Sequence, residues 1–137
     1  MSGYIGRTRK LRKFEKAANK KQVEEEQYSY QQFYQEAKDR VESSVEYYEG
    51  EDIPTFRTDF SSCNILEVEV GTNGYHGGDA GHGGRTYFAL RDVCGTCMET
   101  RLLKDGIELK LAGDCELETF IASLEFALET LKRQISA

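Results

Sequence analysis

Apolar residues recur at helical spacing in two segments of the chain. In the first, steps of three and four residues connect Tyr30, Phe33, Ala37, Val41, Val45 and Tyr48. This spacing predicts a helix over residues 30–49, ended by Gly50 and Pro54. The second stripe runs through Leu117, Phe120, Ile121, Leu124, Leu128 and Leu131, with Asp114 as a candidate N-cap. We expect this C-terminal helix to cover the apolar face of a sheet.

Between the two helical segments, apolar residues alternate with polar ones, as in half-buried strands. The alternation covers residues 66–70, 86–91, 98–102 and 107–111, and Lys104-Asp105-Gly106 supplies a tight turn between the last two. Short connections favour an antiparallel meander. The sequence therefore predicts a single α+β domain over residues 29–137: an N-terminal helix, a four-stranded antiparallel meander and a C-terminal helix.

Length and composition narrow the class of protein. The chain has 137 residues, enough for one domain, and charged residues make up 31% of it. No apolar run reaches the length of a membrane span, and no secretory signal is recognisable at the start. We expect a soluble, cytoplasmic protein. The first helix could pack beside the second, cover the far face of the sheet, or pair with another copy, which would give a homodimer.

Charge divides the chain into a basic arm, residues 1–28, and an acidic body. Residues 1–21 hold eight basic side chains against Glu15 alone, whereas residues 22–137 hold 10 basic and 23 acidic ones. We expect the arm to be partly disordered or helical. It is either a solvated tail or a binding segment for nucleic acid or an acidic partner. In the second case the binding residues are Arg7, Arg9, Lys10, Arg12 and Lys13.

The cysteines suggest a metal site. Cys94-Gly95-Thr96-Cys97 is a C-x-x-C turn, in which two thiolates can converge on one tetrahedral metal. In an up-and-down meander, Cys63, Cys94, Cys97 and Cys115 all fall at one end of the sheet. In the cytoplasm, cysteines are more often metal ligands or free thiols than disulfides. The sequence therefore predicts a structural Zn²⁺ on four thiolates. Alternatively, Cys63 and Cys115 are small buried residues and only the 94–97 turn is special.

Residues 71–84 form a glycine-rich loop that contains seven glycines and both histidines of the chain. Three interpretations are open. His76, Asp79 and His82 could bind a metal for hydrolysis, with Glu67 or Glu69 nearby. The loop N–H groups and Arg85 could cradle a phosphate. Finally, Asp79 and His82 could hydrogen-bond the loop's own backbone and hold it in one shape.

The segments Leu66–Asn73 and Gly77–Thr86 resemble small accessory proteins of phages and other mobile genetic elements. A basic arm ahead of a small acidic α+β body is similar to the layout of certain type II anti-CRISPR proteins. Those proteins bind the RNA-guided CRISPR effector nuclease and prevent it from loading guide or target DNA.

The resemblance implies a non-enzymatic inhibitor in the cytoplasm of a bacterial host, acting by protein–protein contact on this nuclease or another nucleic-acid-processing protein. An acidic surface can compete with nucleic acid for a basic channel. The alternative is a metal-dependent hydrolase or nuclease that uses Asp79 and His82.

Overall fold

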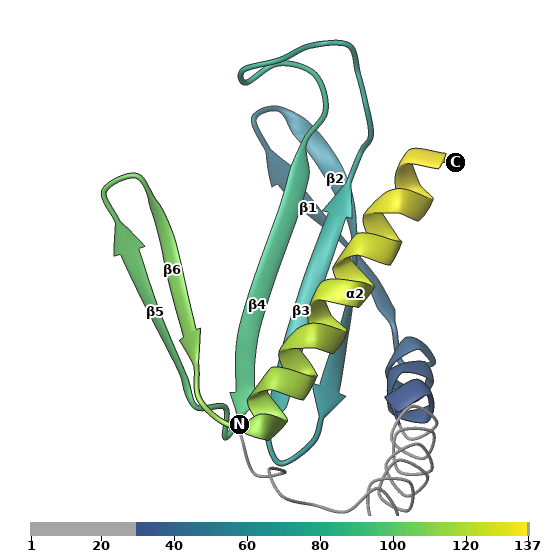
Figure 1. Cartoon of the computed structure of the whole chain (residues 1–137). Coiled ribbons are helices and arrows are strands. Elements are labelled where there is room, and N and C mark those ends of the chain that lie inside the picture. Colours follow the sequence, from purple (N-terminus) through teal and green to yellow (C-terminus); the bar gives the residue numbers. More distant parts are fainter. Residues whose placement is uncertain (1–29, 137) are drawn as a thin grey trace, which may run out of the picture. The chain divides into compact units, whose positions relative to one another are not determined.

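The computed structural model describes residues 30–136. Residues from Glu36 onward form one compact unit. Among the described residues, a helix over residues 30–38 comes first. It is followed by β1 (Glu42–Tyr48), β2 (Glu51–Ser61), β3 (Ile65–Thr72), β4 (Thr86–Cys94), β5 (Met98–Leu103), β6 (Gly106–Leu111) and α2 (Asp114–Ser136) (Figure 1). The predicted basic arm, with Arg7, Arg9, Lys10, Arg12 and Lys13, lies outside the described residues.

The predicted helix over residues 30–49 is wrong beyond residue 38. Residues Glu42–Tyr48 form β1, which pairs with β2 through a tight turn at Glu49 and Gly50. Both turn residues have positive φ, 49° and 83°, as a type I′ hairpin turn requires. Val45 and the two tyrosines after it favour a strand, and pairing with β2 outweighs their helical spacing. Gly50 therefore ends a strand and not a helix.

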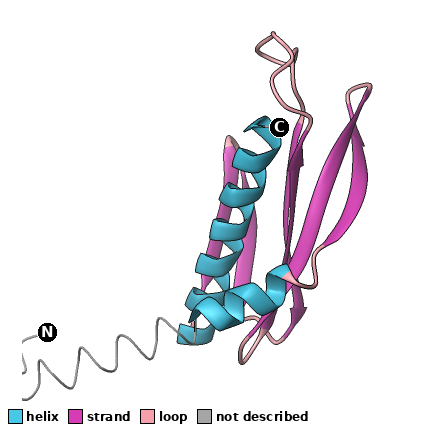
Figure 2. Ribbon diagram, turned by 90° about the vertical axis from the view of Figure 1, so that its right-hand side faces the viewer, coloured by secondary structure: helices cyan, strands magenta, loops and turns pink. Residues whose placement is uncertain are grey.

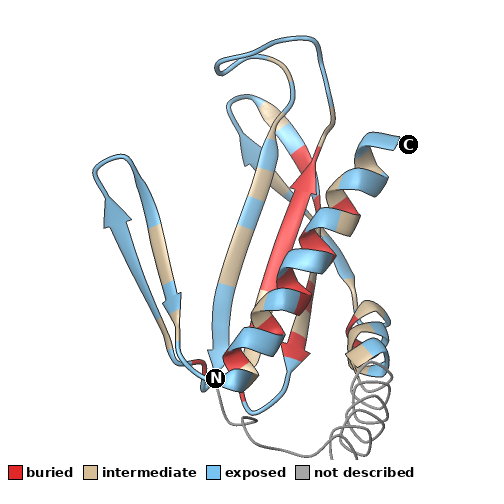
Figure 3. Cartoon of the chain, viewed as in Figure 1, coloured by how far each residue is buried: buried red, intermediate tan, exposed pale blue. Residues whose placement is uncertain are grey.

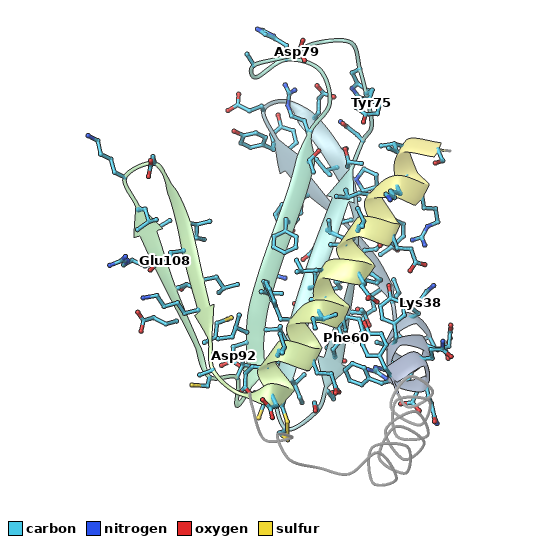
Figure 4. The ribbon with its side chains drawn as sticks, in the orientation of Figure 1. Lys38, Phe60, Tyr75, Asp79, Asp92 and Glu108 are labelled. Atoms are coloured by element: carbon cyan, nitrogen blue, oxygen red, sulfur yellow. A yellow bond between two sulfur atoms is a disulfide. The ribbon has the colours of Figure 1, made fainter. Side chains whose placement is uncertain are left out.

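The fold is α+β, with a four-stranded antiparallel sheet in the order β1-β2-β3-β4. Helix α2 lies along one face of this sheet, over β3 and β2 (Figure 2). The apolar core lies between them and includes Leu66, Val68 and Val70 of β3, all fully buried. Phe60 of β2 packs edge-on against Phe126 of α2, with the ring centroids 6.4 Å apart (Figure 4).

The predicted four-stranded antiparallel meander is observed, in the order β1-β2-β3-β4, but residues 98–102 and 107–111 were wrongly assigned to it. Residues 66–70 and 86–91 lie in β3 and β4, which are neighbours as expected. Within the described part of the chain, however, β5 and β6 pair only with each other and form a separate hairpin. After β4 the chain turns at Gly95, where φ is 64°, and Thr96 is fixed by hydrogen bonds to Asp92 and Ile65. The chain therefore leaves the sheet before β5 begins. The other two strands of the sheet, β1 and β2, come from residues that the sequence did not assign to strands.

Helix α2 covers the sheet, but not with the predicted stripe. Its sheet-facing side is made of mostly small residues: Thr119, Ala122, Ser123, Phe126, Ala127 and Thr130 are buried. The predicted stripe of leucine and isoleucine is largely exposed, and Figure 3 shows buried and exposed residues alternating along the helix. The sheet presents large side chains, so small residues on the helix let the two layers approach closely.

Candidate functional site

The glycine-rich loop leaves the sheet between β3 and β4 and is closed at its base by Asn73 and Arg85. The Asn73 backbone N–H donates to the Arg85 carbonyl at 3.1 Å, and the Arg85 N–H donates to Asn73 Oδ1 at 2.7 Å. Glycine is required where the two arms touch. A Cβ on Gly84 would lie 1.8 Å from the carbonyl oxygen of Gly74. The loop therefore has a defined shape that larger residues would break.

Glu51, at the start of β2, ties the loop to the β1–β2 hairpin. Its Oε1 lies 3.0 Å from Nδ1 of His76, and its Oε2 lies 3.5 Å from Nη2 of Arg85. The Arg85 guanidinium also donates to the carbonyl oxygens of Gly83, at 2.7 Å, and Glu49, at 3.1 Å. The Arg85 side chain is only 12% exposed. These contacts give His76 and Arg85 a structural role in holding the loop.

Asp79 and His82 are placed differently, because their side chains make no hydrogen bond or ion pair within residues 30–136. Both line a hollow of about 470 Å³ between the loop and the C-terminal part of α2. Its other walls include Tyr75 and Lys132, and apolar side chains of α2. His82 also lines a second hollow of about 360 Å³ on the side of the β1–β2 turn. Figure 4 shows Asp79 at the tip of the loop and Tyr75 on the arm nearer α2.

These positions bear on the three interpretations of the loop. The third interpretation required a loop held in one shape by its own hydrogen bonds, and the loop has such bonds. They are made by Asn73, His76 and Arg85, however, and not by the side chains of Asp79 and His82. Among residues 30–136, no three histidine, cysteine or acidic side chains form a group that could hold a metal ion. The larger hollow has one cationic side chain in its lining, Lys132, and one carboxylate, Asp79.

Glu67 and Glu69, expected near the loop, belong instead to a polar network on the face of the sheet opposite α2. Arg91 Nη1 donates to both carboxylates, at 2.9 and 3.1 Å, and Thr55 donates to Glu69 at 2.7 Å. Glu69 is only 2% exposed. Burial opposes the charge on Arg91, but the hydrogen bonds from its guanidinium to Glu69 and Glu67 outweigh burial and raise the Arg91 pKa. The network therefore uses both carboxylates to stabilise the sheet.

The four cysteines lie near one another at the end of the sheet away from the glycine-rich loop. Cys63 and Cys115 are joined by a disulfide, with their Cα atoms 5.7 Å apart. Cys94 and Cys97 are exposed free thiols. Cys94 lies opposite Ile65 in the sheet, two residues from Cys63. The Cys97 N–H donates to the side chain of Glu116, next to Cys115, at 3.0 Å.

The disulfide was not expected. The alternative that Cys63 and Cys115 are small buried residues is wrong, because Cys63 is exposed and Cys115 is half-buried. All four cysteines nevertheless lie at one end of the sheet, as predicted, although the strand assignment behind that prediction is wrong. In the described residues they do not form a group of metal ligands. The C-x-x-C turn is rigid as well, because buried Asn64 donates to Thr96 at 2.8 Å and to Thr119 of α2 at 3.1 Å. A four-thiolate zinc site stays a prediction for the reduced protein, since it needs Cys63 and Cys115 as thiolates.

A further surface is the tip of the β1–β2 hairpin. Sequence reasoning counted its carboxylates as part of an acidic surface that could compete with nucleic acid, but assigned β1 to a helix. We call Glu46, Glu49 and Asp52 the acidic edge. Their carboxylates make no hydrogen bond or ion pair within the part of the chain that the structure describes. Tyr47 and Tyr48, between them in sequence, are 70% and 58% exposed. Among the described strands, β1 lies at an edge of the sheet, where its outer backbone groups make no strand pairing.

Comparison with protein-family models, with curated proteins and with solved structures finds no match for this chain. The resemblance to anti-CRISPR proteins therefore stays a prediction. Neither helix of the described residues is long and apolar enough to cross a membrane.

Proposed function

We propose that the chain is a non-enzymatic inhibitor from a phage or another mobile element. It binds a CRISPR effector nuclease of its bacterial host, or another nucleic-acid-processing protein, and blocks the loading of guide or target nucleic acid. The observation that supports this proposal is the acidic edge. It places carboxylates without partners in the described chain beside two exposed tyrosines on an edge strand.

The chemistry of the acidic edge suits a basic nucleic-acid channel. Carboxylates can take the place of backbone phosphates opposite lysine and arginine side chains. Tyrosine is enriched in protein interfaces because its ring adds contact area while its hydroxyl still forms hydrogen bonds. The unpaired edge of β1 can also pair with a strand of the partner. Glu42, on the same strand, is bound to Arg57 at 3.0 Å and is not counted in the surface.

The test compares two charge-neutralising double variants in binding to a purified, guide-free type II effector nuclease. Glu49→Gln with Asp52→Asn removes two charges from the acidic edge. Glu99→Gln with Asp105→Asn removes two exposed charges from the β5–β6 hairpin and is the matched control. We expect the first variant to bind about tenfold more weakly, with wild-type affinity falling as salt rises, because each exposed charge pair contributes up to about 1 kcal/mol. Equal losses in both variants, or no binding by the wild type, would refute the proposal.

A metal-dependent hydrolase is the second candidate, favoured by one observation: Asp79 and His82 line the same hollow. Nuclease and phosphatase assays with added Mg²⁺, Mn²⁺ or Zn²⁺ test it. A hydrolase predicts activity that both Asp79→Ala and His82→Ala abolish while leaving the fold intact. Inhibition of the nuclease that survives both substitutions would contradict it.

A further inference from the structure

The side of α2 away from the sheet carries a regular apolar stripe that the packing of residues 30–136 leaves largely uncovered. Leu117, Ile121, Leu124, Leu128, Leu131 and Ile135 follow one another at steps of four, three, four, three and four residues. Leu131 is half-buried, and the other five are between 42% and 57% exposed. At 3.6 residues per turn, the stripe points roughly 140° away from the buried side of the helix and runs about 27 Å along it.

This alternation of three- and four-residue steps is the heptad pattern of helices that pack side by side. A helix that only covers a sheet needs one apolar face, and α2 already has that face in its small buried residues. The second face therefore points to a second helix. We propose that α2 pairs in antiparallel orientation with α2 of a second copy of this chain, to form a two-fold symmetric dimer.

Charges beside the stripe favour a second copy in this orientation. Glu118 and Lys132 occupy the same flank, at opposite ends of the stripe, and are both exposed. Within residues 30–136 neither forms an ion pair. Antiparallel pairing places Leu117 opposite Ile135, and Leu124 opposite Leu128, of the other copy. Glu118 then faces Lys132 twice per dimer.

Glu125, on the same flank, lies near the two-fold axis and faces Glu125 of the other copy. This single like-charge contact is outnumbered by the two Glu118–Lys132 pairs. In a parallel pair the flanking residues would face Phe120 and Ala127, which carry no charge, so only the antiparallel arrangement uses Glu118 and Lys132.

The sheet adds apolar area beside α2. Phe88 and Leu90 of β4 lie opposite Val70 and Val68, on the face of the sheet that α2 covers. Helix α2 packs on β3 and β2 and leaves Phe88 51% exposed. A second copy seated on the stripe can also cover this part of β4. The interface then resembles the interior of a layered domain more than a chance contact between surfaces.

Sedimentation equilibrium of the full chain tests the proposal, with Leu124→Glu as the disruptive variant. It puts a carboxylate into the central layer, and we expect the dimer to weaken at least a hundredfold, because a buried charge without a partner is costly. Leu102→Glu is the matched control, because Leu102 is 85% exposed on the β5–β6 hairpin. It should leave the dimer unchanged. Circular dichroism checks that both variants keep their fold.

The orientation is tested by charge exchange. Glu118→Lys and Lys132→Glu should each weaken the dimer by about threefold to tenfold, and the double variant should restore it to within about twofold. A wild-type chain that is monomeric at all concentrations would overturn the proposal. So would a dimer that survives Leu124→Glu, or single variants that the double variant does not rescue. A monomer that dimerises only after deletion of residues 1–29 would show that the chain's own N-terminal residues cover the stripe, and would overturn it too.

Discussion

At each end of the sheet, two reactive side chains are bonded within the fold and two others are not. The bonds at the two ends are of different kinds. At the end with the glycine-rich loop, Glu51 engages His76 through a hydrogen bond and Arg85 through an ion pair, while Asp79 and His82 line a hollow. His76, Asp79, His82 and Arg85 lie within ten residues of one another. Residue type alone therefore does not separate side chains that hold the loop from those that face the solvent.

At the other end a covalent bond makes the same division. The disulfide engages Cys63 and Cys115 and attaches the start of α2 to the segment between β2 and β3. Cys94 and Cys97 remain exposed thiols on a turn that buried Asn64 holds in place. At both ends a rigid segment presents two reactive side chains. The comparison teaches that the bonding partner of a side chain indicates the role of that side chain better than its residue type does.

The largest effect is expected from converting the cysteine end from a disulfide to a metal site. After reduction and anaerobic addition of zinc, we expect about one zinc per chain and a clear rise in Tm. Structural zinc contributes about 10 kcal/mol in small zinc-finger peptides, and part of this should remain after the four thiolates have been brought together. Elemental analysis and thermal unfolding measure both quantities. Reduced protein that stays free of zinc, with four freely titrating thiols, would contradict the prediction.

Breaking the disulfide is expected to have the next largest effect. Cys115→Ala opens a covalent link between residues that are 52 positions apart. We expect the free energy of unfolding to fall by about 2–4 kcal/mol under oxidising conditions, mainly because the unfolded chain gains freedom. Urea unfolding measures it. Cys94→Ala is the matched control and should change stability by less than about 0.5 kcal/mol, since the Cys94 thiol is exposed and free.

At the loop end, Arg85→Ala should have a smaller but clear effect. It leaves the carbonyl oxygens of Gly83 and Glu49 without their donor and removes a cation from Glu51. We expect a loss of about 1–3 kcal/mol in urea unfolding. Arg101→Ala is the control, because Arg101 is 61% exposed and, within residues 30–136, forms an ion pair only with Glu108 of the neighbouring strand. Its loss should stay below about 1 kcal/mol, and equal losses would show that Arg85 does not hold the loop.

The spacing of apolar residues and the structural preferences of individual residues predicted those parts of the fold that the local sequence determines. The β3 and β4 alternations, the β5–β6 turn and the start of α2 at Asp114 are all observed. The helix over residues 30–49 failed because Val41, Val45 and Tyr48 satisfy a helical period by coincidence, and pairing with β2 decides their structure. No local signal shows that β5 leaves the sheet, because a turn fixed by Asp92 and Ile65 decides it.

The candidate sites were predictable to a different degree. Sequence located both reactive clusters, since glycine density and C-x-x-C spacing are visible without a structure. It could not assign partners within them, because Glu51 lies 25 residues from His76 and the two cysteines of the disulfide lie 52 residues apart. The prediction of which face of α2 is buried was wrong for a related reason. Its buried face has the same three- and four-residue spacing as the leucine stripe but is made of smaller residues.

The smallest effect on stability is expected from the two loop side chains that lack partners in the described chain. Asp79→Ala and His82→Ala should each change the free energy of unfolding by less than about 0.5 kcal/mol, because neither removes a hydrogen bond of the fold. His76→Ala should cost about 1 kcal/mol, since His76 bridges Glu51 and the Asn73 carbonyl at 3.0 and 2.9 Å. Urea unfolding of the three variants measures the difference. If Asp79→Ala and His82→Ala each cost as much as His76→Ala, both side chains would belong to the scaffold of the loop, and the division seen at the cysteine end would have no counterpart here.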